Sequence, residues 1–317
     1  MAASDSYSVP ILFLIFNRPE ATREVFKNIR AMRPSRLFVA ADGPRADREG
    51  ERQRCDEVRR IAMKVDWPCE IQTRFREENL GCRAAVSSAI DWFFDHVERG
   101  IILEDDCVPT IEFFMFCQTM LDIYEGDTRV MHVAGTNLND AFDFEGKSYV
   151  FSQYTPIWGW ATWRRAWRNY DVNLSTFDEF KRNGCGRLSF PARLERWHRM
   201  ALYELVRKAR INTWDYQWNY ALIVNRGLSV IPAKSMVTNI GFGDDATHTK
   251  KVRRYFKNSH RQNITFPLRH PNFVNVNYTY DRSYFSNVVR KISPVVRIIL
   301  KLWIPESLYL ALKRLAP

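Results

Sequence analysis

Three consecutive acidic residues follow a short apolar strand, and they carry the clearest chemical signal in the sequence. The run Gly100–Leu103 leads directly into Glu104, Asp105 and Asp106, after which Cys107–Pro109 turns the chain away. Charged side chains at the end of a buried strand are costly unless they are paired, solvated or bound to a metal. At the carboxyl edge of a parallel sheet they make a natural Mg²⁺ or Mn²⁺ site, which shares the ion with water and a substrate diphosphate. The alternative is a solvated loop that binds no ligand.

Two further predicted strands also end in polar residues. The first hundred residues alternate strand and helix in the manner of a parallel sheet, with Asn17 and Arg18 after the first strand and Asp42 after the second. Right-handed crossovers bring these strand ends to one edge of the sheet, which favours a shared site. The predicted strands span 9–16, 36–41, 70–75 and 100–103, and the predicted helices span 20–32, 47–64 and 82–96.

The second half of the chain is predicted to continue the same α/β fold. Its expected elements are a helix at 111–124, a strand at 129–134, an aromatic-rich segment at 149–163, helices at 191–210 and from 213, and a strand at 228–231. We therefore expect a Rossmann-like nucleotide-binding sheet, mostly parallel and flanked by helices. The catalytic unit spans 8–250, with its nucleotide-binding part at about 8–107 and its acceptor part at about 108–250. Residues 251–317 form a basic C-terminal appendage with amphipathic helices.

The composition indicates a globular protein of a reducing compartment. The 317 residues are 46% hydrophobic and 14% aromatic, which is enough for one large core. The six cysteines show neither CxxC pairs nor a repeating framework. The start of the chain, Met1–Val9, is short and polar, and no stretch approaches the apolar length of a spanning helix. These features predict a cytoplasmic protein.

The net charge of +11 is concentrated at the C-terminal end. From Ala246 onward there are 14 lysines and arginines against Asp281 and Glu306, whereas the first 245 residues are nearly neutral. The apolar stripes of Val288–Ile304 and Ser307–Leu315 are studded with basic residues, a pattern typical of helices that lie on an anionic membrane surface. Packing of an ordinary amphipathic helix on the domain is an equal alternative.

Taken together, these pieces resemble a GT-A glycosyltransferase, most closely the N-acetylglucosaminyltransferase I type and its bacterial relatives. Four motifs appear in that family's order over residues 8–250. They are Val39–Asp42, Leu103–Asp106, Ile157–Trp160, and Trp214–Trp218 with the downstream Gly241–Gly243 and His248. The basic tail is not part of the likeness, and neither is the membrane anchor of the eukaryotic enzymes.

The resemblance implies a role for each residue at the edge of the sheet. Asp106 is the direct ligand of Mn²⁺ or Mg²⁺, with His248 as a further candidate, while Glu104 and Asp105 lie nearer the sugar and the ribose. Asp42 accepts hydrogen bonds from the base or ribose of the nucleotide, consistent with a uracil donor. The remaining candidates for donor binding are Asn17, Arg18 and Arg83.

Asp215 is the candidate general base. Direct displacement at an anomeric carbon needs a carboxylate opposite the leaving diphosphate, to take the proton of the acceptor hydroxyl. An N-terminal helix residue stabilised by the helix dipole is the alternative role for Asp215. The residues expected to wall the sugar or acceptor pocket are Trp158, Gly159, Trp160, Trp214 and Trp218.

The predicted function is inverting, metal-dependent transfer of a sugar to a saccharide or lipid-linked acceptor, as in bacterial envelope or exopolysaccharide synthesis. A UDP-GlcNAc-like donor is expected, with possible contact of the tail with the inner face of the membrane and no nucleic-acid partner. One alternative is a sugar-phosphate nucleotidyltransferase, although the Gly-rich loop of those enzymes is missing from Phe16–Glu20. The other is a non-catalytic protein that binds polyanions or glycans.

Overall fold

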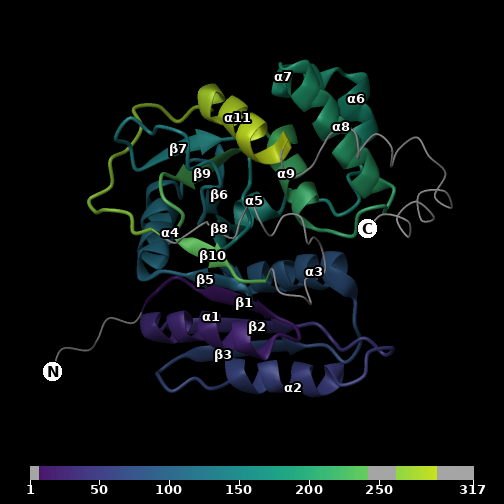
Figure 1. Ribbon diagram of the computed structural model, residues 1–317, viewed down its shortest axis with the longest axis vertical. Helices are drawn as coiled ribbons and strands as arrows, with labels where there is room; N and C mark the ends of the chain where they lie inside the picture. Colours follow the sequence, from purple (N-terminus) through teal and green to yellow (C-terminus); the bar gives the residue numbers. More distant parts are fainter. Residues whose placement is uncertain (1–6, 242–261, 291–317) are drawn as a thin grey trace.

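The computed structural model describes residues 7–241 and 262–290, and its centre is an eight-stranded sheet (Figure 1). The strand order is β3-β2-β1-β4-β8-β6-β9-β7, and β5 pairs separately with β10. The strands are β1 Ile11–Ile15, β2 Arg36–Ala41, β3 Glu70–Phe75, β4 Arg99–Glu104, β5 Cys107–Pro109, β6 Val130–Ala134, β7 Tyr149–Ser152, β8 Trp160–Trp163, β9 Leu228–Pro232 and β10 Val237–Asn239.

Helices flank this sheet along most of the chain, and α2 and α7 lie toward opposite ends of the molecule (Figure 1). The helices are α1 Pro19–Met32, α2 Glu51–Ala62, α3 Gly81–His96, α4 Ile111–Ile123, α5 Arg164–Trp167, α6 Phe177–Arg182, α7 Cys185–Ser189, α8 Arg193–Arg207, α9 Asp215–Val224, α11 Tyr278–Tyr284 and the π-helix η1 Phe285–Val289. The expected α/β class with a Rossmann-like sheet is confirmed.

The two halves of the sheet differ in strand direction. Strands β3, β2, β1 and β4 run parallel, with β1 paired to both β2 and β4. Strand β8 lies antiparallel between β4 and β6, and β7 closes the far edge antiparallel to β9. The aromatic-rich segment of the sequence therefore supplies two strands, β7 and β8, that are not neighbours in the sheet.

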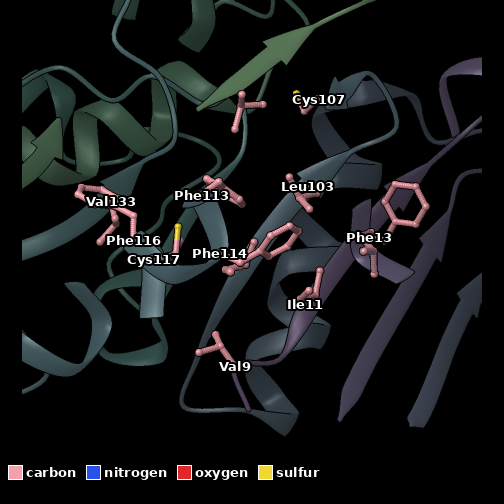
Figure 2. Close-up of a cluster of buried hydrophobic side chains, with 14 of the residues drawn as sticks. Val9, Ile11, Phe13, Leu103, Cys107, Phe113, Phe114, Phe116, Cys117 and Val133 are labelled. Carbon is pink, nitrogen blue, oxygen red and sulfur yellow. The ribbon is translucent and has the colours of Figure 1, made fainter. Parts of the chain in front are cut away.

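Alternate side chains of β1 serve two separate hydrophobic layers. Ile11, Phe13 and Ile15 belong to the layer formed with α1, α2 and α4, whereas Leu12 and Leu14 belong to the layer formed with α3, α5 and α9. Figure 2 shows the first layer, in which side chains of α4 lie near those of β1 and β4. Because both faces of these strands are buried, the position of their polar ends is fixed.

The described part of the predicted appendage packs on the sheet. Ile264 joins the layer beneath α4, and Tyr280 and Phe285 pack with Val150 and other residues near β7. Helix α11 lies beside β7 in Figure 1. The tail beyond residue 290, which carries the predicted membrane-surface stripes, lies outside the described residues. Within the described ranges, none of the helices is both long and apolar enough to cross a bilayer.

A buried carboxyl group holds α11 against β7. Asp281 accepts hydrogen bonds from the Ser152 hydroxyl at 2.5 Å and from the Gln153 backbone N–H at 3.1 Å. Desolvation outweighs these hydrogen bonds and raises the pKa of Asp281 from 3.8 to about 7. The folded state therefore binds a proton that the unfolded state has lost between these two pH values.

We predict that Asp281→Asn removes a pH-dependent loss of stability. As pH rises from about 4 to about 7, ionisation favours the unfolded wild type, and the effect levels off above pH 7. The free energy of unfolding of Asp281→Asn relative to wild type should grow across this window by up to about 4 kcal/mol. Urea unfolding at pH 4, 6 and 8 measures it, with the exposed Asp95→Asn as control. Parallel pH profiles for wild type and Asp281→Asn would contradict the assignment.

Candidate functional site

The registers of the parallel strands bring the predicted polar ends to one edge of the sheet. Leu14 of β1 pairs with Glu104 of β4, and Ile15 pairs with Ala41 of β2. The backbone N–H of Phe16, just past the end of β1, donates to Asp105 Oδ2 at 3.1 Å. The two strand ends are thus joined directly, as the sequence predicts.

Arg18 bridges the last two acids of the motif. Its Nη2 lies 2.5 Å from Asp105 Oδ1, and its Nη1 lies 2.7 Å from Asp106 Oδ2. The Asp105 and Asp106 side chains are only 2% and 12% exposed, whereas the Arg18 side chain is 35% exposed. Such charge-assisted bonds are short and strong, and here they keep two buried carboxylates from being unpaired.

The segment after β10 covers Asp106 from the other side. Asn239 Nδ2 donates to Asp106 Oδ1 at 3.2 Å, and the Ile240 N–H donates to the Asp106 carbonyl oxygen at 2.8 Å. A Cβ atom at Gly241 would lie 2.0 Å from Asp106 Oδ2 and 2.7 Å from Arg18 Nη1. Only glycine lets the backbone approach the ion pair so closely.

The acid motif has the right ligand atoms for a divalent cation. To bind one, however, Asp106 would have to give up hydrogen bonds that it makes within the protein. Glu104, Asp105 and Asp106 offer hard oxygen ligands and outnumber the single positive charge of Arg18. Desolvation, reinforced by the neighbouring carboxylates, raises the pKa of Glu104 and of Asp105, so added positive charge would favour their ionised forms. Both oxygens of Asp106 already accept from protein donors, Arg18 and Asn239.

In the ranges that the structure covers, neither the acid motif nor another group of side chains is already arranged as a metal site. Among the described residues, histidine, cysteine, aspartate and glutamate side chains form no group of three or more arranged to hold a metal ion. His248, the second predicted metal ligand, lies outside the described residues. Mn²⁺ or Mg²⁺ binding by Asp106 is therefore taken up below as a proposal.

Asp42 holds a neighbouring loop. Its carboxylate accepts hydrogen bonds from Asn79 Nδ2 at 2.9 Å and from the backbone N–H groups of Gly43, Leu80 and Gly81 at 3.0 to 3.1 Å. With four donors engaged, the carboxylate acts here as the anchor of the turn that leads into α3. A nucleotide would have to bind beside this loop or displace its hydrogen bonds.

Asn17 and Arg83, which are also predicted to bind the nucleotide-sugar donor, make hydrogen bonds within the protein. Asn17 Nδ2 donates to Glu51 Oε1 at 2.8 Å, and Glu51 is fully buried against Arg45. Arg83 in the first turn of α3 donates to the backbone oxygen of Val172. The sequence signals for Asn17 and Arg83 thus coincide with structural contacts at the rim of the sheet edge.

Asp215 is the first residue of α9 and lines a cavity of about 260 Å³. Its Oδ1 accepts a hydrogen bond from the Thr213 hydroxyl. Desolvation and the charges of Glu104, Asp215 and Asp42 raise the pKa of the Cys82 thiol, whereas Arg18 lowers it, although Cys82 itself reaches the surface. Residues that are far apart in the sequence, from Arg18 to Asp215, therefore lie close enough for their charges to act on one sulfur atom. The fold brings the candidate base and the acid motif to the same region.

The tryptophans predicted to wall the sugar pocket divide into two groups. Trp158 lines the cavity, but Trp160, Trp214 and Trp218 are at most 1% exposed and pack in the layer beneath α9. The rings of Trp160 and Trp214 stack with centroids 5.6 Å apart. These three buried rings differ from their expected place in a pocket wall, because they support the helix turn that begins at Asp215.

Two neighbours of these rings have structural roles. Trp218 Nε1 donates to His132 Nδ1 at 3.1 Å, and burial lowers the pKa of His132 to about 3, so the imidazole stays neutral and can accept. Gly159 has φ +61°, and a Cβ there would lie 2.8 Å from Val237 Cγ2. Gly159 thus allows Val237 of β10 to pack closely against it, two residues before Asn239 contacts Asp106.

Sequence reasoning missed a polar network at the cavity. Arg199 of α8 and the hydroxyl of Tyr203 both donate to Asn219 Oδ1, and the hydroxyl of Tyr154 donates to Glu195 Oε1 at 2.5 Å. Arg199 also lies over the Tyr154 ring, with its Cζ 4.0 Å from the centroid. The available signals were Glu195 and Arg199 on the buried face of an amphipathic helix, and Asn219 four residues after Asp215.

No protein-family model and no curated protein matches the chain. Among solved structures, HddC from Yersinia pseudotuberculosis is similar at 9% identity and a TM-score of 0.30, over 50% of this chain and 77% of that one. The 4-diphosphocytidyl-2C-methyl-D-erythritol synthase from Anaerococcus prevotii matches at 11% identity and 0.32, over 54% and 84%. UDP-glucose pyrophosphorylase complexed with UDP-glucose matches at 9% and 0.25, over 46% and 62%. Similarities this weak carry no argument about function.

We predict that Asp42→Ala destabilises the protein, because it leaves three hydrogen-bond donors of the turn into α3 and the Gly43 N–H without their acceptor. The free energy of unfolding should fall by about 1–3 kcal/mol. Urea denaturation measures the change, with the exposed Asp47→Ala as the matched control. If the two variants unfold at the same urea concentration, Asp42 does not anchor the turn.

Proposed function

We propose that the chain is an inverting glycosyltransferase that moves a sugar from a nucleotide-sugar donor to a saccharide or lipid-linked acceptor. One observation supports this most: Asp215 lines a cavity and lies near enough to Glu104 for its charge to act on that carboxyl group. An acid motif for the diphosphate and a separate carboxylate beside an acceptor-sized cavity are the two parts that direct displacement requires.

In the proposed reaction, Asp215 handles the proton of the acceptor, and the acid motif handles the charge of the leaving diphosphate. Asp215 takes the proton of the acceptor hydroxyl while the oxygen forms its bond to the anomeric carbon. The bond from that carbon to the diphosphate breaks, and the electron pair leaves with the diphosphate. A divalent cation held by the acid motif, with Asp106 as its ligand, would neutralise charge on the leaving group.

The cavity suits a sugar acceptor. Trp158, Tyr154 and Tyr216 present aromatic side chains to it, and Asn219 and Arg199 add polar groups from the network between α8 and α9. A mostly apolar cavity with a few convergent polar groups is the usual form of a small-ligand site. A UDP-GlcNAc-like donor, Mn²⁺ or Mg²⁺ as cofactor, and envelope or exopolysaccharide synthesis complete the proposal, on the strength of the family resemblance.

We predict that Asp215→Asn abolishes transfer and leaves folding intact, because the amide cannot accept the proton of the acceptor. The rate should fall by about 100-fold or more, with an unchanged circular dichroism spectrum. The exposed Asp140→Asn is the control and should keep the wild-type rate. Product analysis by NMR should show inversion at the anomeric carbon. Full turnover by Asp215→Asn, or retention of configuration, would remove Asp215 from this role.

A thermal-shift screen of nucleotide-sugars, with and without Mn²⁺, identifies the donor and tests the function class. Stabilisation by one nucleotide-sugar, followed by transfer to a glycan acceptor, supports the proposal. Release of pyrophosphate from a nucleoside triphosphate and a sugar 1-phosphate would establish the nucleotidyltransferase alternative instead. If no nucleotide shifts the melting temperature and glycans alone do, the chain is a glycan-binding protein.

A further inference from the structure

The contact between Arg18 and Asp106 occupies the carboxylate that a divalent cation would need. The guanidinium places one nitrogen on each acid, at 2.5 Å from Asp105 and 2.7 Å from Asp106. A planar guanidinium matches this two-carboxylate arrangement, which gives the pair geometric specificity as well as charge.

Asp105 and Asp106 differ in how tightly the protein holds them beside Arg18. Asp105 is 2% exposed, and its second oxygen is held by the Phe16 backbone N–H across the sheet edge. Asp106 is 12% exposed, and among the described residues the partners of its second oxygen are uncharged, Asn239 Nδ2 at 3.2 Å and Cys107 Sγ at 3.4 Å. Asp106 is therefore the acid that can exchange its partner while Asp105 stays in place.

Arg18 is also able to leave. Its side chain is 35% exposed, so the guanidinium can turn toward solvent or toward an anionic ligand without crossing the core. A divalent cation that binds alone must displace this guanidinium and give up part of its own hydration. A diphosphate lowers both costs, because its oxygens can contact the ion and the released guanidinium.

We propose that Arg18 and a divalent cation exclude each other at Asp106, so that the cation binds well only together with a nucleoside diphosphate. This inference rests on the proposed function only in using its acid motif, and no turnover is needed to test it. Coupling of this kind is reciprocal, so the cation should raise the affinity for the diphosphate by the same factor.

The test measures Mn²⁺ binding by the EPR signal of the free ion, for wild type and Arg18→Met, with and without uridine diphosphate. Without nucleotide, Arg18→Met should bind Mn²⁺ at least about tenfold more tightly than wild type, and Arg18→Met/Asp106→Asn should lose this gain. With uridine diphosphate, wild type should gain about tenfold or more. Arg23→Met, which removes an exposed arginine of α1, is the control and should match wild type.

Three results would overturn the inference: equal or weaker Mn²⁺ binding by Arg18→Met, no effect of Asp106→Asn, or no gain from uridine diphosphate in wild type. If Arg18→Met is poorly folded, Arg18→Gln and the Mn²⁺-induced rise in melting temperature decide, because a metal that replaces the lost charge should stabilise the uncharged variant more than wild type. The expected coupling together with no transfer from any nucleotide-sugar would reject the proposed function and leave this inference standing.

Discussion

Burial of Asp105 and Asp106, next to the partly buried Glu104 at the end of β4, is the constraint around which this structure is organised. The strand is apolar on both faces, so its end cannot move outward to solvate the acids. The acids are satisfied by Arg18, by the Phe16 N–H and by Asn239 at the end of β10. Phe16 and Arg18 both follow β1, whereas Asn239 ends β10, so the acid motif joins the end of β1 to the separate β5–β10 pair.

The second half of the chain holds Asp215 in place through buried tryptophans, while other aromatic side chains line the cavity. Trp214 and Trp218 flank the start of α9, and their rings are buried against Trp160. A helix whose first turn rests on closely packed rings has little freedom to shift. The candidate base is therefore fixed relative to the acid motif, as direct displacement would require.

The parallel half of the fold could be predicted from the sequence because its signals are local. Apolar runs such as Arg36–Ala41, bounded by turn residues and separated by amphipathic helices, give strand positions and their common edge. The pairing of β5 with β10 and the wide separation of β7 from β8 in the sheet could not be predicted, since they depend on contacts between residues far apart in the chain.

For the candidate site, too, only some features could be predicted from the sequence. The type and order of its acids were readable, but a single sequence does not show which hydrogen-bond partners a side chain will find. Asp42 has four backbone and side-chain donors within the protein, and Arg18 is paired with the acids themselves. Tryptophan is enriched both in cores and in sugar-binding walls, so composition alone could not separate Trp158 from Trp214.

A crystal structure with uridine diphosphate and Mn²⁺ tests the central claim most directly. The account predicts that the ion lies against Asp106, that the diphosphate lies beside it, and that the Arg18 guanidinium has left Asp106 while Asp105 keeps its hydrogen bond from Phe16. Nucleotide and manganese bound away from Asp106, with the Arg18 pair unchanged, would contradict it.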